Sequence, residues 1–210
     1  MTGTQHEKAM ETERLILRQW RDTDIPPFAR LNADPAVMRF FPVLLSADES
    51  AAIAQRMRGI ISEKGWGFWA VELKSCHEFI GFVGLHEQPV ESGIPHTPLV
   101  ELGWRIAAQH WGRGYAPEAG RAALDYAFAV LCLDEVYAFT AVPNEPSKRV
   151  MQKIGMRDTG QEFNHPKLPP GHDLERHCLY RISSARWREI SNSATTKNTE
   201  RAETCEHRYR

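Results

Sequence analysis

The chain has 210 residues, with 26 basic and 27 acidic side chains that leave a formal net charge of −1. This balance argues against a nucleic-acid partner, which usually requires a basic surface. No apolar run reaches the ~20 residues of a membrane span, and the polar start lacks the apolar core of a secretory signal. We therefore expect one cytoplasmic domain without membrane contact, whose four scattered cysteines are free thiols: Cys76, Cys132, Cys178 and Cys205.

The first third of the chain predicts a strand followed by two helices. Residues 12–20 are rich in branched apolar side chains, which is typical of a strand. Asp22 or Thr23 is the expected N-cap of a short helix. A longer helix is expected from Ser46 to Gly65, because Ser46 and Glu49 have the spacing of a capping box and the glycine supplies a stop.

The remainder predicts two helices interleaved with strands. Alanines repeat at helical spacing after Pro117, which suits the first turn of a helix. A second helix is expected over 144–155. The expected strands are apolar runs bounded by turn residues, at 67–73, 78–87, 99–106, 135–142, 156–163 and 176–183.

The order β-α-α-β-β-β-α-β-α-β-β predicts a single α/β (α+β) domain with a mixed sheet. We expect the domain to cover 11–190, after a flexible segment at 1–10. The segment 191–210 holds almost no apolar side chains and is predicted to be a disordered tail. The histidines of "HPKLPPGHDLERH" match no metal-ligand spacing, so we expect a polar loop leading into a strand and no metal: His165, His172 and His177.

The stretch "QHWGRGYAPEAG" (109–120) follows a predicted strand and precedes a helix. Free N–H groups at a helix N-terminus attract anions, and glycines allow phosphate oxygens to approach the main chain. Arg113 adds a cation, so we expect a phosphate or pyrophosphate ligand here, the alternative being a tight turn without a ligand. A P-loop would require a lysine followed by Ser or Thr, and a dinucleotide fingerprint would require glycine where Pro117 stands.

Two motifs together resemble the GNAT superfamily of N-acetyltransferases. The first is Q-x-x-G-x-G-x-A at Gln109, Gly112, Gly114 and Ala116, which resembles the acyl-CoA pyrophosphate loop. The second is "NEPSKRVMQKIGM" (144–156), which resembles a later helix of that superfamily. The run 11–183 is similar to the RimJ/RimL-type branch. The resemblance implies a mostly antiparallel central sheet with one splayed strand pair and flanking helices.

The resemblance also implies a binding site for acetyl-CoA. The pantetheine arm would meet the backbone of the strand before the loop, and the pyrophosphate would lie on the loop amides after a turn that Gln109 opens. Lys148 and Arg149 could contact the adenosine phosphate or simply be solvated. The predicted cofactor-binding residues are Trp104, Arg105, Ile106, Gln109, Gly112, Arg113, Gly114, Tyr115, Asn144 and Ser147.

Acetyl transfer to an amine requires a base and a stabilised oxyanion. Glu101 is the expected base, because strand alternation places it on the face of Gly103 and Arg105; a structural ion pair is the alternative. Its loss should matter most at low pH, where the amine is hardest to deprotonate. Glu87 and His86 are the reserve candidates for the base, and the amide of Arg105 or Ile106 is the expected oxyanion donor.

The thiolate leaves more easily when it receives a proton. Relatives often carry a tyrosine four residues after the [SA] position of the second motif, but Met151 stands there and cannot donate. Ser147 is the expected substitute, unless its hydroxyl only binds the helix backbone. The acceptor pocket is expected to involve residues 39–42, Trp66, Trp69 and Trp104, with Asp34, Glu72 or Glu101 facing the amine, although aromatic side chains are also typical of the core.

These expectations describe an acetyl-CoA-dependent N-acetyltransferase, a monomer or homodimer, that acts by direct attack in a ternary complex. The branch resemblance favours a protein N-terminus as the acceptor, and a small amine stays open. Two other functions stay open: a non-catalytic acyl-CoA-binding sensor or scaffold, and a nucleotide-binding protein.

Overall fold

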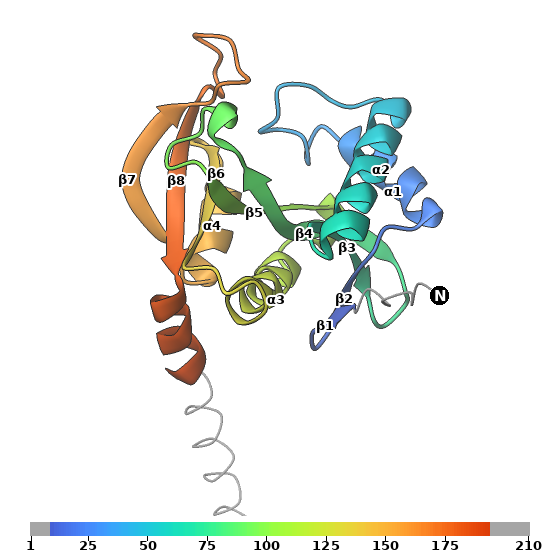
Figure 1. Ribbon diagram of the computed structural model, residues 1–210. Helices are drawn as coiled ribbons and strands as arrows, with labels where there is room; N and C mark the ends of the chain where they lie inside the picture. The colour runs from blue at the N-terminus through green and yellow to red at the C-terminus, as the bar shows by residue number, and fades with distance from the viewer. Residues whose placement is uncertain (1–8, 194–210) are drawn as a thin grey trace, which may run out of the picture.

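Eight strands form one mixed sheet in the computed structural model, which describes residues 9–193 (Figure 1). All neighbouring strands are antiparallel except β5 and β6. The strands, in their order across the sheet, are β1 (Met10–Glu11), β2 (Leu15–Arg18), β3 (Phe68–Leu73), β4 (Phe79–Gln88), β5 (Leu99–Ile106), β6 (Glu135–Ala141), β8 (Arg176–Ser183) and β7 (Arg157–Asn164). The predicted mixed, mostly antiparallel sheet is confirmed.

The labelled helices that flank the sheet are α1 (Ile25–Asn32), α2 (Ala47–Lys64), α3 (Tyr115–Ala129) and α4 (Glu145–Lys153), and a further helix follows β8 at 184–193. The helices α1 and α2 lie together on the side of β3 and β4, whereas α3 packs under β4 and β5, and α4 beside β6 (Figure 1). No helix among residues 9–193 is long and apolar enough to cross a membrane.

The capping signals of α2 are confirmed. The Ser46 hydroxyl accepts a hydrogen bond from the Glu49 amide at 3.2 Å, and the Glu49 carboxylate accepts one from the Ser46 amide at 2.7 Å. Gly65 ends the helix with φ of 79°, a left-handed conformation that glycine adopts without strain. Ala54 and Ile61 are buried in the core, so this face of the helix packs against the rest of the domain.

The predicted N-cap of α1 is wrong. Residues 22–24 form a short 3-10 turn, and α1 begins only at Ile25. The carboxylate of Asp24 does not cap α1: it accepts a hydrogen bond from the Arg21 amide at 2.8 Å and pairs with the buried Arg18. Helix-start signals could not reveal this ion pair, since its other member, Arg18, belongs to β2.

The ends of the folded region differ slightly from the prediction. Met10 belongs to the short strand β1, which the sequence analysis missed, and residues 184–193 form a helix after β8. The folded part therefore begins one residue before 11 and continues past 190. The rest of the predicted N-terminal segment and tail, with Cys205, lies outside the described residues. Among the described cysteines, Cys76 and Cys132 are exposed, Cys178 is buried, and all three are free thiols.

Candidate active site

The loop between β5 and α3 is exposed at Gly112 and Arg113 and turns at two glycines. Gly112 and Gly114 have φ of 74° and 82°, and Gly114 is the N-cap of α3. The helix begins at Tyr115, two residues before the expected start, so Pro117 still lies in its first turn. A Cβ placed on Gly112 would meet no atom within 4 Å. The space above this glycine is therefore open to a ligand, as a phosphate-binding turn requires.

A side chain that the sequence analysis missed holds this loop in place. Arg14, just before β2, donates a hydrogen bond to the Arg113 carbonyl at 2.9 Å and pairs with Glu118 at 2.6 Å. Its guanidinium also lies 4.7 Å from the ring centroid of Tyr115. The contact joins residues about a hundred positions apart, and no local pattern signals it. Arg14 thus fixes the carbonyl side of the loop and leaves the N–H side free.

The strands β5 and β6 diverge beside the loop. They share one registered pair, Glu101 opposite Tyr137, whereas β4 and β5 pair along their whole length. The Ala107 amide donates to Ile80 on β4. Because main-chain groups alternate in direction along an antiparallel strand, those of Arg105 also face β4, and those of Trp104 and Ile106 face the gap.

This alternation distinguishes the three residues whose backbone was expected to contact the pantetheine arm: Trp104, Arg105 and Ile106. Trp104 and Ile106 present main-chain groups to the gap beyond the last β5–β6 pair. The Ile106 carbonyl accepts a hydrogen bond from the Trp111 indole at 2.7 Å, so the amide is the main-chain group of Ile106 that stays available to a ligand in the gap. The Arg105 amide is directed towards β4, so it cannot be the oxyanion donor that the sequence analysis considered. Its contribution to the site is its side chain.

The start of α4 lies on the other side of the gap. The Asn144 side chain caps the helix: its oxygen accepts from the Ser147 amide at 3.3 Å, and its nitrogen donates to Thr140 at 2.8 Å and to the Ser147 hydroxyl at 3.0 Å. Asn144 therefore has no donor left for a ligand. The Ser147 hydroxyl accepts this hydrogen bond from Asn144, and its own proton is available for donation to another group. Met151, at the position of the expected tyrosine, is buried in the core.

The predicted cations on α4 differ in their surroundings. Lys148 pairs with Glu145 at 2.8 Å, and Arg149 is exposed. Gln109 is also exposed and lies in the short turn before the loop.

Glu101 lies at the point where β5 and β6 part. Burial raises the pKa of its carboxyl group to about 7, against the opposing effects of a hydrogen bond from Gln88 and the charge of Lys167. His86 stands directly across on β4, and its ring stacks on Phe68. Burial and the nearby charges of Lys167 and Lys64 lower the pKa of His86. Glu101 is thus the carboxylate here that titrates near neutrality.

The other candidate carboxylates have structural partners. Glu87 points to the opposite face of β4 and pairs with Lys64. Glu72 is buried and contacts Arg18, Arg21 and His77. The Asp34 carboxylate accepts a hydrogen bond from the Ala36 amide at 2.8 Å. Of the three groups expected to face the amine, only Glu101 is at the diverging strands.

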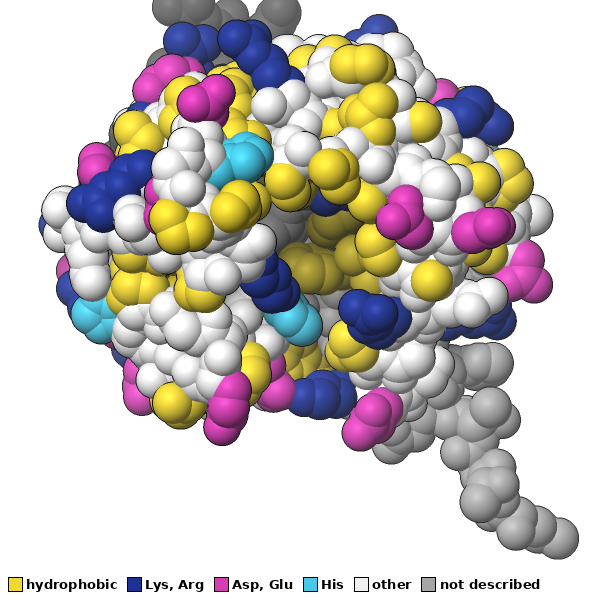
Figure 2. All heavy atoms as spheres, turned by 90° about the horizontal axis from the view of Figure 1, so that it is seen from above, with side chains coloured by type: hydrophobic (Ala, Val, Ile, Leu, Met, Phe, Trp, Pro, Cys, Tyr) yellow, Lys and Arg dark blue, Asp and Glu magenta, His cyan; other side chains and the backbone are white. Residues whose placement is uncertain are grey.

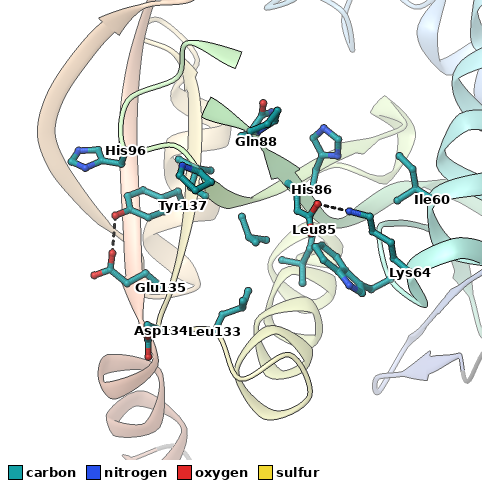
Figure 3. Close-up of a pocket in the computed structure, with 16 residues that line it drawn as sticks. Ile60, Lys64, Leu85, His86, Gln88, His96, Leu133, Asp134, Glu135 and Tyr137 are labelled. Atoms are coloured by element: carbon teal, nitrogen blue, oxygen red, sulfur yellow. Dashed lines mark hydrogen bonds and ion pairs between the residues drawn. The ribbon is translucent and has the colours of Figure 1, made fainter. Parts of the chain in front are cut away.

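A cavity of about 940 Å³ is lined by His86, Gln88 and Tyr137, the residues that pair with or hydrogen-bond to Glu101, while Glu101 itself lies behind this lining. In Figure 3, Tyr137, His96 and Glu135 form one wall, and Leu85, His86, Lys64 and Ile60 form the other. Seen from above, the molecule is hollowed between its two halves, with apolar side chains in the hollow and basic ones around it (Figure 2). Trp66 lines this cavity, whereas Trp69 is buried against Tyr126 and belongs to the core.

The histidine-rich loop forms part of the β7–β8 side. The rings of His165 and His177 lie 4.7 Å apart and pack with Phe139 and Phe163. Burial, with the neighbouring His177 and Lys167, lowers the pKa of His165 to about 4. Among residues 9–193, no three His, Cys, Asp or Glu side chains gather as metal ligands.

The comparison with known proteins identifies the family. The model of the Acetyltransferase (GNAT) domain matches residues 14–157. From Bacillus subtilis (strain 168), the uncharacterized protein YkkB is 34% identical over 74% of this chain and 90% of its own length. The uncharacterized N-acetyltransferase YnaD of the same organism is 30% identical over 84% of this chain and 97% of its own. The chain belongs to the GNAT family of acetyltransferases.

Solved structures agree with this assignment. The crystal structure of a GNAT-family acetyltransferase from Bacillus anthracis superposes with a TM-score of 0.71 and 25% identity, covering 85% of this chain and 99% of that one. The predicted fold and the predicted enzyme class, an N-acetyltransferase, are thereby confirmed.

Proposed function

We propose that the protein transfers the acetyl group of acetyl-CoA directly to a primary amine in a ternary complex, with Glu101 as the general base. The observation that carries this proposal is the position of Glu101, a carboxyl group with a pKa of about 7 at the divergence of β5 and β6. A base works best when its pKa lies near the working pH.

The donor fits the gap between the strands. The amides of Gly112 to Tyr115 are placed to receive the pyrophosphate, since Gly112 is open above and α3 starts beside it. The gap-facing groups of Trp104 and Ile106 are suited to hold an extended amide-containing arm. Acetyl-CoA, the donor of this enzyme family, carries both features.

The transfer then proceeds by three contributions from the chain. Glu101 accepts the proton of the incoming amine as nitrogen attacks the thioester carbonyl. The amide of Ile106, facing the gap, stabilises the negative charge that develops on the carbonyl oxygen. The Ser147 hydroxyl already accepts a hydrogen bond from Asn144 and is free to donate, so it gives its proton to the departing thiolate, and the proton that Glu101 took from the amine returns to Ser147 through solvent.

The finer assignments rest on the sequence motifs. The resemblance of residues 11–183 to RimJ/RimL-type enzymes supports a protein N-terminus as acceptor, and a small amine is the other candidate. The free cysteines support a cytoplasmic location.

One observation favours a second function. Met151 is buried where many relatives carry a proton-donating tyrosine, as expected for a non-catalytic acyl-CoA sensor. Release of free thiol from acetyl-CoA in the presence of a panel of amines and peptides tests both functions. Amine-stimulated release supports the enzyme. Tight CoA binding without release would support the sensor, and protection by ATP or NAD in place of CoA would overturn both.

A further inference from the structure

The side chain of Arg105 lies on the α1 and α2 face of β5 without a carboxylate partner. Its Nη1 donates to the Asn32 amide oxygen at 2.6 Å. Its Cζ lies 4.0 Å from the ring centroid of Phe41, in the loop between α1 and α2, and its Nε is buried without any hydrogen-bond partner. Among residues 9–193, no acidic group lies within ion-pair distance of it.

Arg18, which is buried whereas Arg105 is half-buried, shows how this chain satisfies the charge of another inward-facing arginine. Arg18 makes two hydrogen bonds to Asp24, at 2.7 and 2.9 Å, and one to Glu72 at 2.6 Å. Burying an unpaired charge is costly, so buried arginines are normally paired in this way. Arg105 has one neutral amide oxygen in place of two carboxylates, which leaves an anion-binding position unfilled.

The surroundings of Arg105 are ordered to hold it in this position. Asn32 is fully buried, and its amide nitrogen donates to the Ser50 hydroxyl at 3.0 Å, which directs its oxygen to Arg105. Phe41 covers one face of the guanidinium, and the ring of Phe82 lies 5.6 Å away. Burial lowers the pKa of Arg105 to about 10, at which the side chain is still charged at neutral pH.

We propose that Arg105 binds a carboxylate of the acceptor, so that the acceptor is a primary amine that also carries a carboxylate. This inference rests on the proposed function. Glu101 and Arg105 lie on one face of β5, with Cα atoms about 13 Å apart at the rise of a strand. The long arginine side chain can bring its guanidinium closer to Glu101 than the Cα distance suggests. The planar guanidinium can bind a carboxylate through two parallel hydrogen bonds.

The same chemistry is present in free amino acids and in peptides with an acidic residue near the N-terminus. In either case the carboxylate fixes the acceptor at Arg105 while Glu101 takes the proton from its amine. The donor's phosphates meet a different part of the molecule, the amides of Gly112 to Tyr115, so they do not supply the missing charge.

The test compares matched acceptors in the thiol-release assay. Each of several amino acids is paired with its carboxamide and its decarboxylated amine, and acidic tripeptides are paired with their amide counterparts. The kcat/KM values are corrected for the fraction of free amine. We expect the carboxylate member of a pair to be favoured at least tenfold, with the preferred size class separating amino acids from peptides.

Variants assign the preference to Arg105. Arg105→Gln should bring the ratio within a pair close to one, and Arg105→Lys should restore part of it. Arg30→Gln removes an exposed cation of α1 and should keep the full ratio. Melting temperatures verify folding. A wild-type ratio of one, or an equal loss with all acceptors in Arg105→Gln, would overturn the inference.

A binding experiment distinguishes failure of the proposed function from failure of the inference about Arg105. If no amine stimulates thiol release, binding of the same pairs to the CoA-loaded protein is measured by calorimetry. Binding of the carboxylate member that is lost in Arg105→Gln would uphold the role of Arg105 without catalysis. Equal binding or no binding of the two members would overturn it.

Discussion

Glu101 and His86 face each other across β5 and β4, and the pKa values of the two side chains are shifted in opposite directions. Burial raises that of Glu101 to about 7 and lowers that of His86. At neutral pH the pair therefore consists of a half-ionised carboxyl group and a neutral imidazole. Glu101 is the member that can take up a proton in this range.

The pH dependence of Glu101→Gln follows from this pairing. In the wild type, kcat/KM should rise through about pH 7 as Glu101 ionises. Loss of a general base typically costs 10²–10⁴-fold, so the variant should be slower by about that factor above pH 7 and should lack the inflection. This reverses the expectation from sequence, because a carboxyl group with this pKa is protonated at low pH. An equal loss at every pH would indicate a positioning role.

The same substitution should stabilise the fold at high pH. The pKa of Glu101 is raised from 4.5 to about 7 in the folded state, so ionisation opposes folding above pH 7, and the penalty is absent below pH 4.5. We expect Glu101→Gln to raise the free energy of unfolding by about 1–3 kcal/mol at pH 8 and by little at pH 4. Urea unfolding at both values measures this. Glu87→Gln, at an exposed ion pair, is the control, with an expected change below about 0.5 kcal/mol.

Gly112→Val should weaken CoA binding at least tenfold, because its side chain occupies the open space above the loop. Gly160→Val is a matched control: Gly160 has φ of 73°, and a Cβ there also meets nothing within 4 Å. Both variants should lose about 1–3 kcal/mol of stability through backbone strain. Calorimetry with CoA separates the two effects. Equal CoA affinity in the two variants would remove the loop from the binding site.

Ser147→Ala tests the proton donor. We expect kcat to fall about tenfold or more, a loss on the scale of general-acid catalysis. The CoA affinity should change little, since Asn144 still caps α4 through the Ser147 amide. Stopped-flow measurement of the first turnover isolates the chemical step. An unaltered rate would end the assignment of Ser147 as acid.

Glu72→Gln should destabilise the protein by about 3–5 kcal/mol at pH 7, the usual cost of breaking a buried ion pair. Burial opposes ionisation of Glu72, but hydrogen bonds from His77 and Arg18 and the charges of Arg18 and Arg21 outweigh it, so its pKa is lowered. The stabilisation is therefore present above pH 4.5 and lost as the pH falls further. In thermal unfolding, the melting temperatures of the wild type and Glu72→Gln should become similar as the pH falls below 4.5.

The sequence predicted those parts of the fold that depend on local patterns. The capping box of α2, its glycine stop and the alanine stripe of α3 each follow from side chains within one or two helical turns. The N-cap of α1 was predicted wrongly, because the ion pair between Asp24 and Arg18 is a tertiary contact.

The candidate site shows the same division. The glycines at 112 and 114 were visible in the sequence because a phosphate-binding turn needs them close together, and here only Arg113 separates them. The clamp by Arg14 and the isolation of the Arg105 side chain were not, since both depend on residues from distant elements. Strand alternation placed Glu101 on the face of Gly103, but without a known partner strand it could not show which main-chain groups of β5 face the gap.

The single pairing of Glu101 with Tyr137 makes the sheet two structural halves with a weak connection. Strands β1 to β5 are joined by two or more registered pairs at each step, as are β6, β8 and β7, whereas one registered pair joins the two sets. An extended ligand in the gap would supply the absent connection. Amide hydrogens on both sides should then exchange with solvent more slowly, and the two halves should unfold in one transition at a higher temperature.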